Sequence, residues 1–190
     1  MRANYKNTIK KLSGKTSDIV SVVMETYNKD WQQVSELAKT FGSGNIPVAK
    51  VCKNIFDYVI DNVQYREDPP GVQWVKTPAR LLADGVGDCK SMSIFIASCL
   101  RALGIDHFFR FVSFNNRKEA THVYVVAKPS PLMGRDGEGL IIIDPVVRPI
   151  QFNKEERYTF KSDIGMSGNY YMSGLGAITN QVIHSNSIIS

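Results

Sequence analysis

Apolar residues recur at three- and four-residue spacing in the first third of the chain, which is typical of amphipathic helices. A first stripe begins after the capping residues Thr16-Ser17-Asp18 and ends at Gly42-Ser43-Gly44, so it predicts one long helix. A second stripe follows Pro47, which suits a first helical turn. The core-facing positions are Ile19, Val22, Val23, Trp31, Val34, Leu37, Ala38 and Phe41 in the first helix, and Val48, Val51, Cys52, Ile55, Tyr58 and Val59 in the second.

A third helical stripe follows the glycine-punctuated turn Gly85-Val86-Gly87-Asp88. Asp88 can cap the first turn and Gly104 supplies a stop, so Cys89 stands at the start of this helix. Cys99 lies inside the stripe and is expected in the core, about 15 Å along the helix from Cys89, which excludes a disulfide between the two. The stripe consists of Met92, Phe95, Ile96, Cys99, Leu100 and Leu103.

Beyond the third helix the pattern changes to the β-branched and aromatic runs of strands. Residues 108–114, 122–126 and 140–143 predict three strands, and the prolines and glycines of 128–139 predict a long hairpin loop. Antiparallel pairing is the economical topology. We therefore predict an α+β domain in which N-terminal helices and the central cysteine-bearing helix pack on an antiparallel sheet. Residues 63–80 are rich in turn signals and predict an irregular loop that leads into the cysteine turn.

Length and composition favour one domain without a membrane span. A chain of 190 residues with 43% hydrophobic content can bury one substantial core. No apolar run approaches the roughly 18 residues that a span requires. The start of the chain leads into no apolar signal region, so we expect a cytoplasmic protein, or a virion protein if a phage encodes it. Three cysteines without close spacing favour a reducing compartment.

The net charge of +5 belongs to the N-terminus, where five basic residues precede the first acidic residue, Asp18. We divide the chain into a basic arm over residues 1–17, a domain over 18–160 and a tail over 161–190 that is uncharged from Gly165 onward. A nucleic-acid partner is expected only weakly and through the arm, because basic and acidic side chains balance in the rest of the chain.

The tail combines apolar side chains with an absence of charge. From Gly165 to Ser190 there is no Asp, Glu, Lys or Arg, yet tyrosines and isoleucines recur among glycines, serines and asparagines. Disordered segments are usually charged and poor in such residues, so we expect the tail to lie against something. Its own domain is the preferred partner, and a second copy of the chain or another assembly partner stays open.

Cys89 is the first catalytic candidate, because the unpaired N–H groups and the dipole of a helix's first turn stabilise a thiolate. A cysteine at a helix start is as often a small core residue as a catalytic thiol. The residues expected near Cys89 therefore decide between these two interpretations. His122 opens an apolar strand, and Asp144 ends another, where a neighbouring imidazole would hold its carboxylate. A turn-initiating role is the alternative for Asp144. His107 and His184 are expected to be surface or packing residues.

Four short motifs surround these candidates: Gly87-Asp88-Cys89, Leu100-Arg101-Ala102-Leu103-Gly104-Ile105, His122-Val123-Tyr124-Val125 and Ile143-Asp144-Pro145. Together they resemble the transglutaminase-like superfamily, a branch of the papain-like cysteine enzymes, over residues 50–150. The preceding loop is similar to that of bacterial and bacteriophage members of this superfamily in the positions Tyr65, Asp68-Pro69, Gly71-Val72, Pro78, Leu81 and Gly85.

The resemblance implies an acyl-transfer enzyme that needs no cofactor or metal and acts on carboxamides of a protein or peptide. Cys89 would attack the carbonyl carbon, His122 would act as base and then as acid, and Asp144 would orient His122. Water as acceptor makes a peptidase or amidase, and an amine makes a transglutaminase; the choice stays open. The backbone N–H of Cys89 and the side chain of Gln73 or Trp74 are candidates for the oxyanion hole.

Two positions depart from the family pattern. Tyr124 stands where members commonly have a tryptophan, which is a conservative packing change. Lys90-Ser91 stands where bacterial members often have acidic residues. We expect Lys90 to point to solvent, and support of the Cys89 thiolate is the alternative. Neither departure removes a catalytic group.

Two other functions stay open from the sequence. The basic arm and the uncharged tail would also suit a structural or assembly protein, such as a component of a phage particle, that keeps the fold without its chemistry. Cys89, His122 and Asp144 offer the sulfur, nitrogen and oxygen donors that zinc accepts. No Cys-x-x-Cys or His-x-x-x-His spacing accompanies them, so we expect no metal site.

Overall fold

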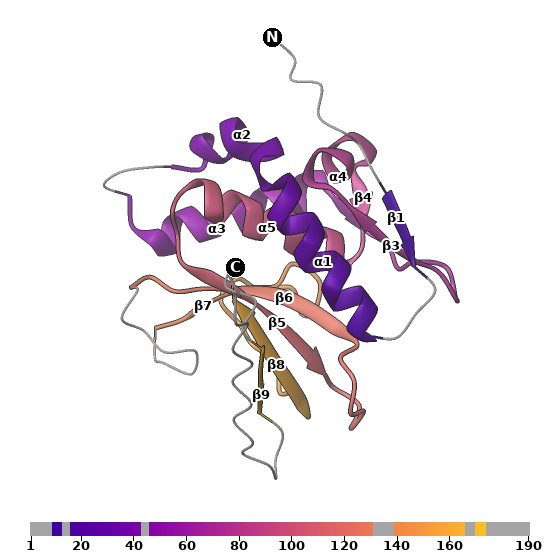
Figure 1. The fold of residues 1–190 in the computed structure, drawn as a ribbon. Helices are drawn as coiled ribbons and strands as arrows, with labels where there is room; N and C mark the ends of the chain where they lie inside the picture. The colour runs from indigo at the N-terminus through magenta and orange to yellow at the C-terminus, as the bar shows by residue number, and fades with distance from the viewer. Residues whose placement is uncertain (1–8, 13–15, 43–45, 131–138, 166–169, 174–190) are drawn as a thin grey trace, which may run out of the picture.

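The computed structural model describes residues 9–12, 16–42, 46–130, 139–165 and 170–173, and these form two layers, helices over an antiparallel sheet (Figure 1). This arrangement confirms the predicted α+β class. Among the helices of this described part, none is long and apolar enough to cross a membrane. The helices are α1 (Thr16–Asp30), the 3₁₀ turn η1 (Trp31–Val34), α2 (Ser35–Thr40), α3 (Val48–Asn62), α4 (Pro78–Asp84) and α5 (Cys89–Ala102).

The main sheet has five strands in the order β7-β6-β5-β8-β9, and every neighbouring pair is antiparallel. Its strands β5, β6 and β7 are the three predicted from the sequence, so their antiparallel pairing is confirmed. Beside this sheet, β1 pairs with β3 and β2 pairs with β4. The strands are β1 (Ile9–Leu12), β2 (Gln64–Tyr65), β3 (Gln73–Lys76), β4 (Val86–Gly87), β5 (His107–Ser113), β6 (His122–Ala127), β7 (Ile141–Ile143), β8 (Phe160–Gly165) and β9 (Tyr170–Ser173).

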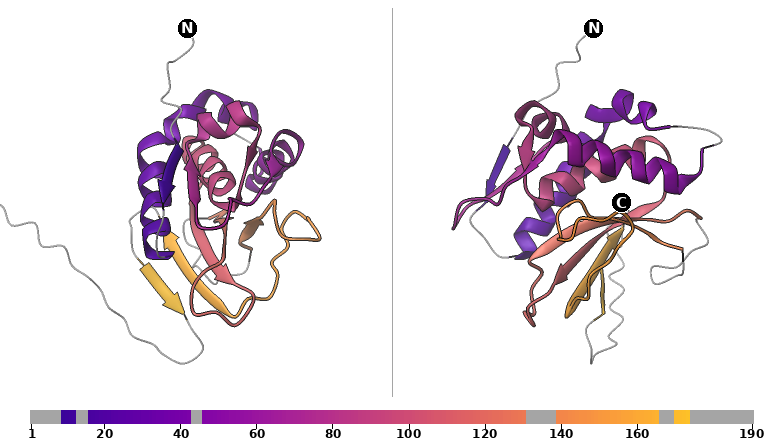
Figure 2. Two further views of the ribbon diagram at one scale, coloured as in Figure 1. Left: turned by 90° about the vertical axis from the view of Figure 1, so that its right-hand side faces the viewer. Right: turned by 180° about the vertical axis from the view of Figure 1, so that it is seen from behind.

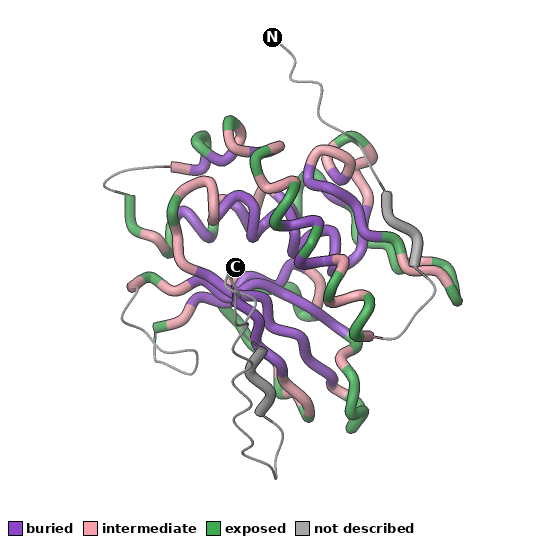
Figure 3. Tube along the Cα trace, in the orientation of Figure 1, coloured by how far each residue is buried: buried purple, intermediate pink, exposed green. Residues whose placement is uncertain are grey.

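Helix α5 is the centre of the hydrophobic core. It lies between the other helices and the sheet (Figure 2), and it packs against α1, η1 and α2 as well as against β6. Every residue from Lys90 to Leu100 is buried, which is the mark of a helix surrounded on all sides (Figure 3). Cys52 and Cys99 have no exposed surface, as predicted for core residues.

The prediction of one long first helix is wrong, because the helix is interrupted after Asp30. The η1 turn follows, and α2 resumes the α-helical path. At the break the amide of Gln33 donates to Oδ1 of Asp30 at 3.0 Å and accepts the backbone N–H of Ala79 at 3.0 Å. Ala79 belongs to α4, so a distant segment contributes to the break. The apolar spacing continues through the interruption and therefore did not reveal it.

The prediction of an irregular loop over 63–80 is also wrong in part, since this segment contains β2, β3 and the start of α4. Thr77 caps α4 by accepting a hydrogen bond from the backbone N–H of Arg80 at 3.3 Å, and Pro78 occupies the first turn. The Thr-Pro pair therefore starts a helix, where its composition alone indicated a turn.

Both predicted terminal segments contribute strands. Within the predicted arm, β1 pairs antiparallel with β3. Strand β8 begins at Phe160 and lies beside the central strand β5, so the predicted boundary at residue 160 cuts through the sheet. A buried ion pair accompanies this placement, because the guanidinium of Arg110 donates to both carboxylate oxygens of Asp163 at 2.8 Å each. Apart from β9, the tail beyond Gly165, His184 included, lies outside the described residues.

Candidate active site

The turn before α5 makes Cys89 the first residue of that helix. Asp88 caps the helix with a carboxylate oxygen that accepts the backbone N–H of Ser91 at 3.1 Å. Gly87 allows a close approach to α4, because a Cβ at this position would lie 2.4 Å from Cδ1 of Leu81. Cys89 is half-buried, whereas the other two thiols of the chain are fully buried. It is thus the thiol that a reagent or substrate can reach.

His122 and Asp144 meet at one end of the paired strands β6 and β7. His122 is the first residue of β6, and Asp144 follows the last residue of β7, which pairs antiparallel with β6. Nε2 of His122 lies 2.8 Å from Oδ2 of Asp144. The other oxygen, Oδ1, accepts the backbone N–H of Val146 at 3.0 Å. Both side chains are at least nine-tenths buried, so the pair is shielded from water.

The ionisation of His122 links the pair to the cysteine. Burial alone would lower the pKa of His122, but hydrogen bonds to Asp144 and to Cys89 outweigh it and raise this pKa to about 10. Because Asp144 occupies Nε2, the ring nitrogen left for the thiol is Nδ1. The structure thus brings together Cys89, His122 and Asp144, from a helix tip and two strand ends.

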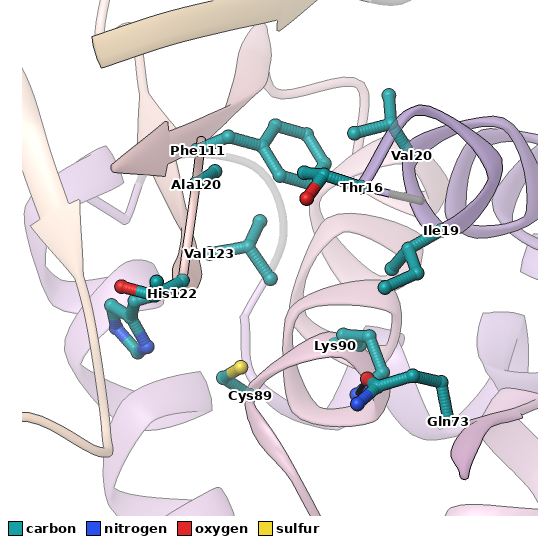
Figure 4. A pocket seen from close by; sticks show the side chains of 11 residues that line it. Thr16, Ile19, Val20, Gln73, Cys89, Lys90, Phe111, Ala120, His122 and Val123 are labelled. Atoms are coloured by element: carbon teal, nitrogen blue, oxygen red, sulfur yellow. Dashed lines mark hydrogen bonds between the residues drawn. The ribbon is translucent and has the colours of Figure 1, made fainter. Parts of the chain in front are cut away.

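Cys89 and His122 open into a cavity of about 260 Å³ between α1 and the sheet (Figure 4). Its apolar walls come from Ile19 and Val20 on α1 and from Phe111 and Val123 on the sheet, while Gln73 and Lys90 supply polar groups. A nucleophile and a base on the wall of one cavity can act on a bound carbonyl group. Among the residues that the structure describes, no three His, Cys, Asp or Glu side chains are grouped as metal donors.

The two side chains predicted for the oxyanion hole lie in different places. Gln73 lines the cavity together with Cys89. Trp74, the next residue of β3, is not among the lining residues and is 36% exposed. Since neighbouring residues of a strand point to opposite faces, only one of the two could reach the cavity.

The expectation that Lys90 points to solvent is wrong. The residue is 7% exposed, and its ammonium donates to Asp68, Gln73 and Asp88. Asp68 was part of the loop motif, but no spacing in the sequence connects it with Lys90. A lysine this deeply buried requires carboxylate partners, and those come from the loop before β3 as well as from the helix cap.

His107 lies apart from the cavity and has a packing role. It opens β5, is buried, and forms a hydrogen bond of 2.9 Å between Nε2 and the hydroxyl of Tyr27. Its Nδ1 lies 2.7 Å from the carbonyl oxygen of Ile105. Burial lowers the pKa of His107 to about 4, so the ring is neutral near pH 7.

Comparison with known proteins bears on the family and the fold of the chain. The profile of the Transglutaminase-like superfamily matches residues 35–145. This range includes Cys89, His122 and Asp144. No curated protein matches the chain. A candidate protease from Parabacteroides distasonis has a similar solved structure, with 11% identity and a TM-score of 0.52 over 92% of this chain. The match covers 32% of that protein, so this chain spans about a third of its length, and the likeness concerns the fold alone.

Two other solved structures show weaker similarity. Calcium-bound LapG from Legionella pneumophila has 17% identity and a TM-score of 0.49, over 78% of this chain and 83% of LapG. A candidate cysteine protease from Cytophaga hutchinsonii has 16% identity and a TM-score of 0.41, over 88% of this chain and 60% of that protein. None of these matches bears on the alternative role in a phage particle.

Proposed function

Since the chain belongs to the transglutaminase-like superfamily, we propose that it is a cysteine-dependent acyl-transfer enzyme acting on carboxamides of proteins or peptides. The observation that carries this proposal is the contact of 2.8 Å between His122 and Asp144, beside a half-buried cysteine on the wall of the same cavity as His122. A thiol nucleophile, a base and a group that orients the base are the three parts that such chemistry requires.

The first half-reaction forms a thioester. The proton of Cys89 passes to Nδ1 of His122, and the sulfur attacks the carbonyl carbon of the carboxamide. The tetrahedral intermediate then expels the amine, which takes the proton from His122 as the carbon–nitrogen bond breaks. The pKa of about 10 suits this second step, because the imidazolium holds its proton until the leaving amine needs it.

The second half-reaction releases the acyl group. A water molecule gives a proton to His122 while its oxygen attacks the thioester carbon, and the sulfur leaves as Cys89 thiolate. The product is then a carboxylic acid, as in a peptidase or amidase. We propose water as the acceptor, and a primary amine in its place would give a cross-linked amide. Mass analysis of the product with and without added methylamine distinguishes the two acceptors.

The oxyanion of the tetrahedral intermediate needs donors. The backbone N–H of Cys89 lies in the first turn of α5, where N–H groups have no partner within the helix. The side-chain amide of Gln73 reaches the same cavity and supplies a second donor, whereas the ring of Trp74 lies outside the cavity lining. Removing one such donor typically lowers the rate by about 10²–10³.

The proposed activity is tested by the pH dependence of iodoacetamide labelling. Cys52 and Cys99 are fully buried and burial raises the pKa of both thiols, so labelling of the native protein reports on Cys89. We expect Cys89 to react faster at pH 6 than a free cysteine does, and His122→Gln to abolish this excess. Cys89→Ala is the control for labelling elsewhere. A Cys89 that reacts no faster at pH 6 than an ordinary thiol would contradict the proposal.

A further inference from the structure

Lys90 is a buried cation beside the nucleophile, and its position has a consequence for Gln73. Its Nζ donates to Oε1 of Gln73 at 2.7 Å and to Oδ2 of Asp68 at 3.1 Å, and it also contacts Oδ2 of Asp88. We propose that Lys90 is a positioning residue that holds the Gln73 carboxamide with its Nε2 end toward the cavity, as a donor to the oxyanion. This inference rests on the proposed function.

The orientation of the amide follows from the donor character of an ammonium group. A glutamine amide has one end that accepts, Oε1, and one end that donates, Nε2. Lys90 has donors only, so Oε1 must face it. Nε2 is then the end left for the cavity that Gln73 and Cys89 both line (Figure 4). Without the lysine, nothing in these contacts would select one amide orientation over the other.

Lys90 itself is held by two carboxylates from different segments. Asp68 belongs to the loop before β3, and its Oδ2 also accepts the backbone N–H of Trp74 at 2.7 Å. Asp88 is the cap of α5. The network therefore fixes the Gln73 backbone through its neighbour Trp74 and the Gln73 side chain through Lys90. Burial alone would lower the pKa of Lys90, but the neighbouring Asp88, Cys89 and Asp68 outweigh it and raise this pKa, so the ammonium stays charged.

A second role for the same cation is direct support of the Cys89 thiolate, and two reagents separate the roles. Iodoacetamide reacts with the thiolate at a saturated carbon, so no oxyanion forms. Acylation by p-nitrophenyl acetate needs the same thiolate and in addition passes through a tetrahedral oxyanion. A residue that acts through Gln73 changes the second rate and leaves the first unchanged.

The experiment compares Lys90→Met, Gln73→Ala and the combination of both. We expect each single change to lower the acylation rate by about 10- to 100-fold, which is at or below the typical effect of losing one oxyanion donor. The alkylation rate of each variant should stay within about twofold of that of the unmodified protein. The combined variant is expected to acylate no more slowly than Gln73→Ala alone, because under this proposal Lys90 acts on the oxyanion only through Gln73.

The matched control is Lys76→Met. Lys76 is also 7% exposed, and its ammonium contacts Asp84 and the carbonyl oxygen of Val86 near the same turn. Within the described part of the chain its ammonium forms no hydrogen bond with Gln73, so this variant breaks a comparable buried ion pair without touching the amide. We expect both rates to stay near those of the unmodified protein at temperatures where the variant is folded.

Lys90→Met leaves two buried carboxylates without a cation, so thermal unfolding is measured first. If that variant does not fold, Lys90→Met is combined with Asp68→Asn, which removes one carboxylate and keeps an acceptor for the Trp74 N–H. The acylation and alkylation rates of this double variant should equal those expected of Lys90→Met. Parallel losses of acylation and alkylation, or additive losses in the combined Lys90→Met and Gln73→Ala variant, overturn the inference. An unmodified protein whose Cys89 neither acylates nor labels rapidly at pH 6 overturns the proposed function instead.

Discussion

The carboxylate of Asp144 is engaged at both oxygens, one 2.8 Å from Nε2 of His122 and the other accepting the backbone N–H of Val146 at 3.0 Å. Because the second contact fixes the carboxylate plane, Asp144 can hold the imidazole ring in one orientation. The ring then presents its remaining nitrogen to Cys89. The relationship between these two side chains, more than the cysteine alone, supports the proposed catalytic role of Cys89.

Replacing Asp144 with Asn should lower the pKa of His122. The hydrogen bond to Asp144 is the foremost influence that raises this pKa, to about 10 in the intact protein, against the opposing effect of burial. NMR titration of the His122 ring should therefore show a midpoint near 10 before the change and a clearly lower one after it. His107 is the internal control, and its midpoint should not move. An unchanged His122 midpoint in the variant would argue against the orienting role of Asp144.

Gly87→Ala should destabilise the turn that carries Cys89. The added Cβ would lie 2.4 Å from Cδ1 of Leu81 and 3.3 Å from Cβ of Ser91. Overpacking of this kind typically costs about 1–3 kcal/mol, which urea unfolding measures. Leu81→Ala removes the clashing atom, so the combined variant should lose less than the sum of the two single losses. Strictly additive losses would show that the contact with Leu81 is not the cause.

His107 should make the protein less stable in mild acid. The unfolded chain binds a proton at His107 near the ordinary value of 6.5, whereas the folded protein resists protonation until about pH 4, because burial lowers the pKa. The contribution of neutral His107 to the free energy of unfolding is therefore fully present above pH 6.5. It declines by about 3 kcal/mol as the pH falls toward 4. His107→Gln keeps a partner for Tyr27 and does not titrate. Urea unfolding at pH 7 and pH 4.5 should show a smaller decline for this variant, and equal declines would contradict the prediction.

Arg110→Met should destabilise the sheet strongly. The change leaves Asp163, whose side chain is 4% exposed, without its bidentate partner between β5 and β8. Removing one member of a buried ion pair typically costs about 3–5 kcal/mol, again measured by urea unfolding. Glu155→Gln is the matched comparison, because this second carboxylate on Arg110 is 28% exposed and its loss should cost much less. Similar losses for the two variants would show that burial of the Asp163 charge is not decisive.

Much of the fold could be predicted because it depends on local pattern. The cap at Asp88, the helical spacing after it and the glycine stop place α5 without reference to other segments. The same holds for β5, β6 and β7, whose runs of aromatic and β-branched residues are typical of strands. The interruption after Asp30 and the position of β8 could not be predicted, because Ala79 and Arg110 contribute to them from distant parts of the chain.

The amino-acid sequence by itself determined that Cys89 stands at a helix start and that His122 and Asp144 stand at strand ends, since caps and periodicities act over a few residues. Only the tertiary structure decided what surrounds them. The antiparallel register of β6 and β7 brings His122 to Asp144, and burial with two carboxylates turns Lys90 inward toward Gln73. Such contacts depend on the packing of whole elements, and hydrogen bonds between residues 17 or more positions apart leave no local pattern in the chain.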